Sequence, residues 1–309
     1  TKERYLARLF AMRFTDHSRL AVYGNMNNLN DDRKPGENDN WSPSDLFGGL
    51  TQQQLGGLDY NIDARSGKYK LSGNAQVRHA DNTIVNNTNR TNFLANGDTY
   101  DRIVANNRNH NFTLSTDHQF YFEFKNANLN IKPRFNYQYY NNKSGYSSLT
   151  LNRSFTSFSK AQLDSLYTPM IGRELIRTAI NRNLRNGLSI GHSLEGSVSM
   201  ESLIKFKHSP DHITLYADAS LRHANEDSFD RNRIDYYTNG QQSNTDFRNR
   251  YFNNRPDHGY SMTGKVTYSY LVKRGLFFDF SYKYNRTTSN RYSSLYRLDQ
   301  LADWGINSE

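Results

Sequence analysis

A strict two-residue alternation of apolar and polar side chains recurs along this chain, and it constrains the fold more than any other feature. The clearest example is LNIKPRFNYQYY at 129–140, where odd positions are apolar or aromatic and even positions from Asn130 to Gln138 are polar. Successive side chains of a β-strand point to opposite faces, so this segment has one apolar and one polar face. Because the pattern returns in strand after strand with charge on the polar side, it indicates a sheet between lipid and water.

The strands are predicted in pairs, because each alternating segment is followed by a short turn and a second alternating segment. The dipeptides Ser-Gly, Pro-Asp and Arg-Gly at these turns are typical of tight hairpins. We therefore expect an all-β fold, an antiparallel transmembrane β-barrel, as a single domain over 1–309. The predicted strands, about ten in number, are 4–14, 19–26, 57–65, 70–79, 110–120, 129–140, 188–206, 213–222, 260–270 and 276–284.

Long polar stretches separate the pairs, and we predict them as loops. Short turns at one end and long loops at the other are typical of an outer-membrane barrel, whose short turns are periplasmic and whose long loops are extracellular. The stretch 141–187 also has apolar residues at helical spacing, so we expect a long external loop with short helices there. The predicted loops are 28–55, 81–109, 141–187 and 225–257.

Composition excludes several other classes of protein. Only 35% of the residues are hydrophobic, and no run approaches the roughly 18 apolar residues of a membrane helix. The mean hydropathy is −0.90, but the aromatic content of 14% argues against a disordered chain. With no cysteine, disulfides and thiolate sites are excluded. The net charge of +9 is scattered along the chain rather than clustered, so we expect no nucleic-acid binding.

Alternate positions along each predicted strand, odd or even, point to opposite faces and so define two surfaces of the sheet. Charges on a lumen-facing surface would set solute selectivity or hold a plug, and aromatic residues on a lipid-facing surface would form girdles at the two interfaces. The lumen-facing residues are Lys132, Arg134, Gln138, Glu195, Glu201, Asp218, Arg222, Lys265, Asp279 and Lys283. The lipid-facing or girdle residues are Phe135, Tyr137, Tyr139, Leu215, Tyr268, Tyr270, Phe280, Tyr282 and Tyr284.

No catalytic or metal-binding motif stands out, and we expect no enzyme activity, cofactor or metal. The nucleophile-elbow, zinc-protease and phosphate-loop patterns are all missing from the sequence. The acidic stretch 31–45 lacks the regular ligand spacing of a calcium loop, which favours a solvated loop. Four histidines have the parity of the apolar face, and we interpret them as strand-end residues at an interface rather than metal ligands: His79, His110, His192 and His223.

Two segments resemble the outer-membrane β-barrel family of the Bacteroidota, which is related to TonB-dependent receptors. They are LAVYGNMNNLND at 20–31 and GGLDYNIDARSGKYKLSGNAQVRHADNTIVNNTNRTNFLANGDTY at 56–100. The resemblance is specific over about 1–140, and beyond that only the recurring alternation of predicted strands continues it. Unlike complete members, the chain shows no signal peptide, TonB box or plug, and it ends in GINSE without a terminal aromatic. We therefore expect part of a larger barrel.

The resemblance implies a protein of the outer membrane of a Gram-negative bacterium that transports or receives an unidentified solute. Its implied partners are outer-membrane lipid and lipopolysaccharide, together with a surface lipoprotein, TonB or other outer-membrane complex subunits. One alternative hypothesis is a structural barrel subunit of an outer-membrane secretion or assembly complex. Another is a secreted soluble β-sandwich that binds carbohydrate through its many tyrosine and asparagine side chains.

Overall fold

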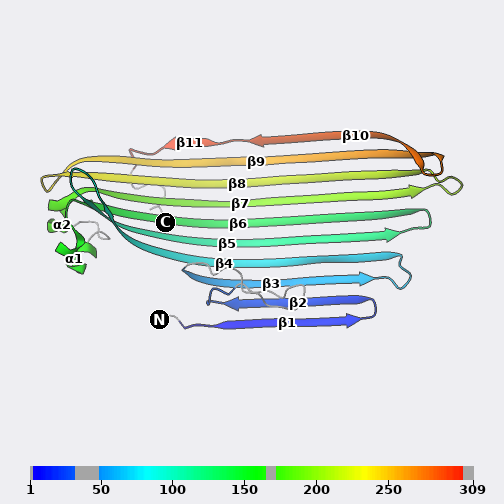
Figure 1. The fold of residues 1–309 in the computed structure, drawn as a ribbon, viewed down its shortest axis with the longest axis horizontal. Coiled ribbons are helices and arrows are strands. Elements are labelled where there is room, and N and C mark those ends of the chain that lie inside the picture. Colours follow the sequence, from blue (N-terminus) through cyan, green and yellow to red (C-terminus); the bar gives the residue numbers. More distant parts are fainter. Residues whose placement is uncertain (1–2, 32–48, 165–171, 302–309) are drawn as a thin grey trace.

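The computed structural model describes residues 3–31, 49–164 and 172–301, and nearly all of them lie in one antiparallel β-sheet (Figure 1). The all-β, antiparallel part of the prediction is confirmed. The strands are β1 Leu6–Thr15, β2 Ser18–Asn27, β3 Leu50–Asp63, β4 Tyr69–Asn92, β5 Thr99–Glu123, β6 Ala127–Leu151, β7 Ala179–Lys205, β8 His212–Thr238, β9 Gln241–Lys273, β10 Leu276–Arg291 and β11 Ser294–Arg297.

The strands follow one another in space in the order of the sequence, from β1 to β10, and β11 pairs with the far part of β9. From β1 to β10, each strand therefore pairs with its neighbour along the chain, as in a meander. In the part of the chain that the structure describes, the sheet is open, because β1 and β10 do not pair with each other. Closure into a barrel stays a prediction.

The short turns lie at one end of the sheet, on the right in Figure 1. They join β1 to β2, β3 to β4, β5 to β6, β7 to β8 and β9 to β10, which are the five pairs that the sequence predicts. Gly67 and Gly275 stand in two of these turns with φ of 69° and 86°. Glycine adopts such positive φ angles without the steric cost that a Cβ brings, so the turns can be tight.

The prediction of long loops is wrong over much of the opposite end of the sheet. The stretches 81–109 and 225–257 are largely strand, since β4 continues to Asn92 and β5 begins at Thr99, while β8 and β9 meet across Asn239 and Gly240. The β4–β5 backbones pair there in continuous register, and the β8–β9 backbones pair with register shifts at Ala224/Glu226 and Tyr236/Tyr237, although both faces are polar. Without an apolar face these extensions have no alternation, which is why the sequence pattern does not reveal them. Of the predicted loop 28–55, residues 32–48 lie outside the described part.

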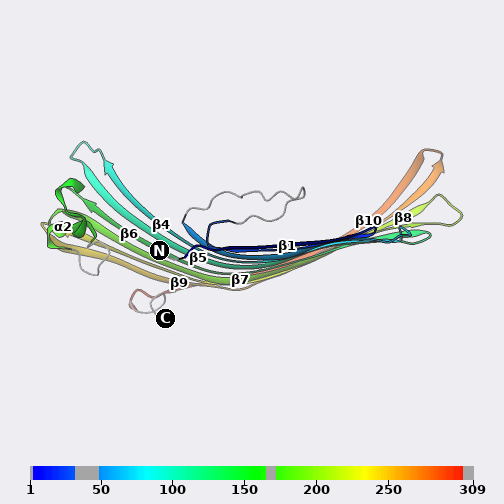
Figure 2. The ribbon, with the colours of Figure 1, turned by 90° about the horizontal axis from the view of Figure 1, so that it is seen from below.

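The stretch 141–187 is shorter as a connection than predicted, because β6 runs to Leu151 and β7 begins at Ala179. It does contain short helices, as predicted: the 3₁₀ helix η1 Phe155–Ser157, α1 Lys160–Asp164 and α2 Arg173–Thr178. Figure 2 shows a curved sheet with α2 at the end opposite the short turns. No helix among the described residues is both long and apolar enough to span a membrane.

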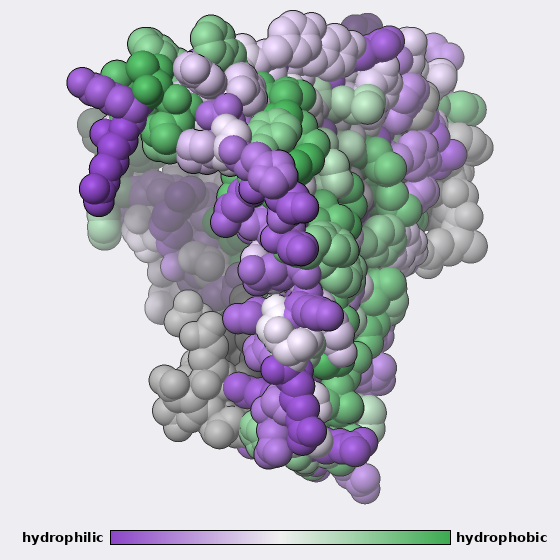
Figure 3. All heavy atoms as spheres, turned by 90° about the vertical axis from the view of Figure 1, so that its right-hand side faces the viewer, coloured by the Kyte–Doolittle hydropathy of each residue, from purple (hydrophilic) through white to green (hydrophobic). Residues whose placement is uncertain are grey.

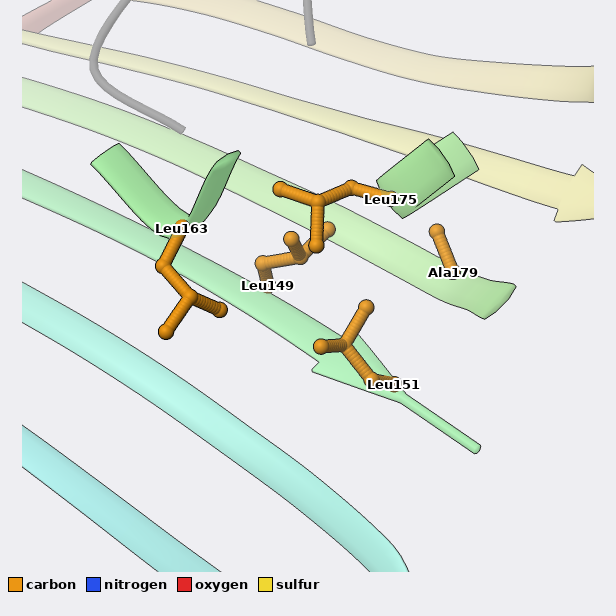
Figure 4. Packing of buried hydrophobic residues seen from close by; sticks show 5 residues of the cluster. All are labelled: Leu149, Leu151, Leu163, Leu175 and Ala179. Carbon is orange, nitrogen blue, oxygen red and sulfur yellow. The ribbon is translucent and has the colours of Figure 1, made fainter. Parts of the chain in front are cut away.

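The helices cover a small hydrophobic core at this end of the sheet. Leu163 from α1 and Leu175 from α2 point toward Leu149 and Leu151 on β6 and Ala179 on β7 (Figure 4). Leu149, Leu151 and Leu175 are fully buried. The ion pair between the Arg102 guanidinium and the Asp164 carboxylate, 2.9 Å apart, ties α1 to β5. This cluster is distinct from the long apolar surface nearer the short turns, which no described element covers.

Candidate functional site

The sheet has one polar and one apolar face, and the strand register assigns residues to them. Directly paired residues of an antiparallel sheet point to the same side. Arg134 on β6 pairs with Asp117 on β5 and with Ser197 on β7, and the same row continues through Ser220 to Ser261. This row defines the polar face. The neighbouring row, from Phe135 through its partners, defines the apolar face.

All ten residues predicted to face a lumen lie on the polar face, from Lys132 on β6 to Lys283 on β10. All nine residues predicted to face lipid lie on the apolar face, including Phe135, Leu215 and Phe280. Whether these faces meet a lumen and lipid stays a prediction. Within the second set, Tyr268 and Tyr270 lie near the short turns and Tyr137 and Tyr139 lie farthest from them. Tyr282 and Tyr284 pair with Val266 and Gly264, between these two levels.

The apolar face is exposed over most of the sheet. Phe280 is 64% exposed, Leu221 51% and Met262 50%, and Leu20, Val77 and Val198 are exposed as well. Viewed from the end with the short turns, hydrophobic side chains gather on one side of the sheet and hydrophilic side chains on the other (Figure 3). Large apolar surfaces of this kind are rare on soluble monomers and mark a contact with lipid or protein.

The apolar segments have similar lengths on neighbouring strands. On β6 the segment runs from Leu129 to Tyr139, and on β7 it runs from Ile204 back to Leu194. Each is close to the about 9–11 residues of a tilted transmembrane strand. Beyond it, both faces of the strands are largely polar until the helix-covered core is reached. We call this exposed strip the apolar band.

Histidines stand at the end of the apolar band. The four that the sequence places on the apolar face are confirmed there by the register, and His258 on β9 joins them. The sequence analysis missed His258 because it lies outside the predicted strand 260–270. Among the described residues, no group of three or more histidines and carboxylates is arranged to hold a metal ion.

The polar face carries a chain of ion pairs. Arg134 lies 2.9 Å from Asp117, and Arg222 lies 3.6 Å from both Glu195 and Asp257. Asp257 also accepts a hydrogen bond from Arg291 at 2.8 Å. The sequence analysis did not single out Asp117, Asp257 and Arg291. Asp117 could have been found from the sequence, because it is an odd position of the predicted strand 110–120, whose apolar residues, such as Phe112, are at even positions. Asp257 and Arg291 lie outside the predicted strands.

Four of these charged residues border an open hollow of about 710 Å³ on the sheet. Its lining includes Asn74, Asp117, Arg134, Glu195 and Arg222. The hollow mixes both signs of charge with amide and hydroxyl groups and with the apolar or aromatic residues Phe135, Leu221 and Tyr260, so it offers a solute or a protein segment polar as well as apolar contacts. No nucleophile and base with a third orienting group, the arrangement that covalent catalysis uses, is recognisable among these side chains.

A buried carboxylate stabilises the end of the sheet near the helices. Asp101 on β5 accepts hydrogen bonds from Arg90 at 2.6 Å, Asn92 at 2.9 Å and Thr150 at 2.8 Å. Burial alone would raise the pKa of Asp101, but these hydrogen bonds and the Arg90 charge hold the pKa below its usual value. The carboxylate therefore fastens β4, β5 and β6 together beyond the apolar band.

Comparison with known proteins adds no relative, since neither a protein-family model nor a curated protein matches this chain.

Proposed function

We propose that this chain is part of the wall of an outer-membrane β-barrel, similar to the TonB-dependent receptors, that transports or receives a polar solute. The observation that carries the proposal is the exposed apolar band on one face of a sheet whose other face is charged. A bilayer would cover the band, and the charged face would line an aqueous interior. The hollow beside Arg134 and Arg222 offers such a solute both charges and hydrogen-bonding groups.

The open sheet edges fit this proposal only if they find partners in the membrane. Backbone N–H and C=O groups cannot stay unpaired in hydrocarbon, so a spanning sheet must close on itself or on further strands. We therefore propose that β1 and β10 are each joined to another strand of the same barrel. A soluble carbohydrate-binding sandwich is less favoured, because it would bury an apolar face under a second sheet, and the described residues form only one.

A matched pair of arginine substitutions on β7 tests the proposal. Val198 lies on the apolar face and Ser199 on the polar face, one residue away. In lipid vesicles, Val198→Arg should destabilise the folded protein by about 2–4 kcal/mol, and Ser199→Arg by much less. The measurement is reversible unfolding of the vesicle-bound protein in guanidinium chloride. Equal tolerance at both positions, or a protein that stays monodisperse without lipid or detergent, would contradict the proposal.

A further inference from the structure

A row of histidines crosses the end of the apolar band that lies farthest from the short turns. The histidine row, as we name it, has one member on each of five strands, and Tyr139 on β6 fills the gap between them. All six side chains share the apolar face. The row comprises His79 on β4, His110 on β5, His192 on β7, His223 on β8 and His258 on β9.

The row is continuous from β4 to β7. The rings of His79 and His110 lie edge to face, with centroids 4.7 Å apart. The His110 ring lies 6.3 Å from that of Tyr139, and Tyr139 is the direct register partner of His192. Residues of these four strands therefore present a line of aromatic nitrogen and hydroxyl groups, in which His110 lies two residues farther from the short turns than the register level of His79, Tyr139 and His192.

The row continues from β7 to β10 in the same way. The ring centroids of His192 and His223 are 6.2 Å apart, and His223 is the direct register partner of His258. On β10, the Asn290 amide nitrogen lies 3.4 Å from Nε2 of His258. His223 and His258 are exposed, so this part of the row is open to a ligand from outside the sheet.

The row coincides with a change in chemistry on the apolar face. On each strand, the next residue of this face toward the short turns is apolar or aromatic. The next residue of this face in the opposite direction is mostly polar. On β5, for example, Phe112 is the neighbour of His110 toward the short turns, and Arg108 is its neighbour on the other side, on the same face. The residues on the apolar side of the row are Val77, Phe112, Tyr137, Leu194, Leu221 and Tyr260.

Charged groups near the row on this face are mainly basic. β4 contributes Asp81, which is 2.6 Å from Arg108 of β5, and β8 contributes Asp227, which pairs with Arg255 of β9. β7 contributes no charge near the row. Two further cations lie on this face: Lys143 of β6, the register partner of Arg108, and Arg286 of β10, which lies over the Tyr260 ring.

We propose that the histidine row binds the anionic phosphate groups of lipids that surround the protein. The inference rests on the proposed function, because the apolar band must be embedded for headgroups to reach the row. Imidazole N–H groups donate hydrogen bonds to phosphate oxygens. The excess of basic groups is complementary to phosphate. A lipid phosphate, unlike a free one, is held at this level by its acyl chains beside the band.

The test compares three forms of the full chain in two kinds of vesicle. The vesicles are phosphatidylcholine alone or with phosphatidylglycerol. The forms are the wild type, a variant with all five row histidines changed to glutamine, and a control with His17→Gln and His208→Gln near the short turns. The readout is the temperature at which the folded, vesicle-bound protein unfolds. Flotation of the vesicles separately measures insertion.

The expected result is an unfolding temperature that rises by a few degrees with the anionic lipid for the wild type and the control. The five-histidine variant should lose most of this rise. An equal rise in that variant, or the same rise from inorganic phosphate added to phosphatidylcholine vesicles, would overturn the inference while insertion still supports the barrel. Failure of the wild type to insert into either vesicle would overturn the barrel and the inference together.

Discussion

Two charged residues of the polar face, Asp101 and Arg222, differ in how much they should stabilise the fold. Arg222 is half exposed and its carboxylate partners lie 3.6 Å away, so water screens the attraction. Such pairs contribute about 0–1 kcal/mol. Asp101 is only 7% exposed and accepts three hydrogen bonds. Burial, more than the number of charges, therefore decides which polar residues maintain the sheet.

The Asp101 carboxylate should make stability depend on pH. Its folded-state pKa is lowered, so its contribution is complete above the unfolded pKa, near 3.9, and is lost as the pH falls through the folded pKa. We expect Asp101→Asn to cost about 1–3 kcal/mol at pH 7. The difference from wild type should shrink near pH 3, as measured by urea unfolding in micelles. A constant difference across this range would contradict the assignment, and Arg222→Ala serves as the near-neutral comparison.

Gly73 and Gly264 both lie on the apolar face, but only one has room for a side chain. A Cβ at Gly73 would overlap the His118 ring and come 2.8 Å from the carbonyl oxygen of Asp117, whereas one at Gly264 would meet nothing within 4 Å. His118 cannot move freely, because its Nδ1 lies 3.0 Å from the Tyr60 hydroxyl. We expect Gly73→Ala to destabilise by about 1–3 kcal/mol and Gly264→Ala to be tolerated in the same unfolding assay. A larger loss at Gly264 would show that the packing described at Gly73 is wrong.

At the scale of elements, the sequence predicts the strand pairs well where one face is apolar and poorly where both are polar. The alternation from Leu129 to Tyr139 locates β6 and its faces, but nothing comparable marks the part of β8 after Glu226. One local signal in that region was overlooked. Asn239-Gly240 is the dipeptide typical of a type I′ hairpin, and both residues have positive φ, 53° and 76°. Reading that turn would have joined β8 to β9.

Substitution at this turn should therefore weaken the β8–β9 hairpin. In Gly240→Ala the new Cβ is strained at φ of 76° and approaches Cγ of Arg177 at 3.3 Å. We expect a cost of about 1–2 kcal/mol. Faster amide hydrogen exchange at 236–243 would report it, without change in β6. Asn239→Gly, which keeps the turn conformation accessible, should leave exchange at wild-type rates; rapid exchange in both variants would argue against a requirement for positive φ.

The helix-covered core should behave as a separate unit from the apolar band. Leu175 is fully buried against Leu149 and Leu151, whereas Ile180 is 37% exposed. We expect Leu175→Ala to destabilise the helices by about 2–5 kcal/mol and Ile180→Ala to have little effect. Protease cleavage within 155–178 should accelerate in the first variant only, while the amount of protein inserted into vesicles stays unchanged. Loss of insertion in Leu175→Ala would mean that this core is needed for the whole fold.

At the scale of the whole molecule, parity predicts which residues share a face but not what encloses them. The two-residue period is a property of each strand, so Lys132 and Lys283 could be placed on one face from the sequence alone. Closure depends on how β1 and β10 pair at the sheet edges, and local alternation does not specify their partners. The ion pair between Asp257 and Arg291 joins residues more than thirty positions apart in the sequence. It depends on the register of β9 against β10, and the local sequence pattern does not specify that register.

The height of the apolar band predicts the bilayer that the molecule prefers. From Leu129 to Tyr139, at about 3.3 Å per residue and a tilt near 40°, the band is about 25 Å tall. Insertion should be greatest in vesicles whose hydrocarbon thickness is about 25–30 Å and should fall in thicker ones, because polar groups beyond the histidine row would then enter hydrocarbon. Flotation with phosphatidylcholines of increasing chain length measures this. Insertion that is independent of thickness would contradict the assigned band, even if the protein binds the vesicles.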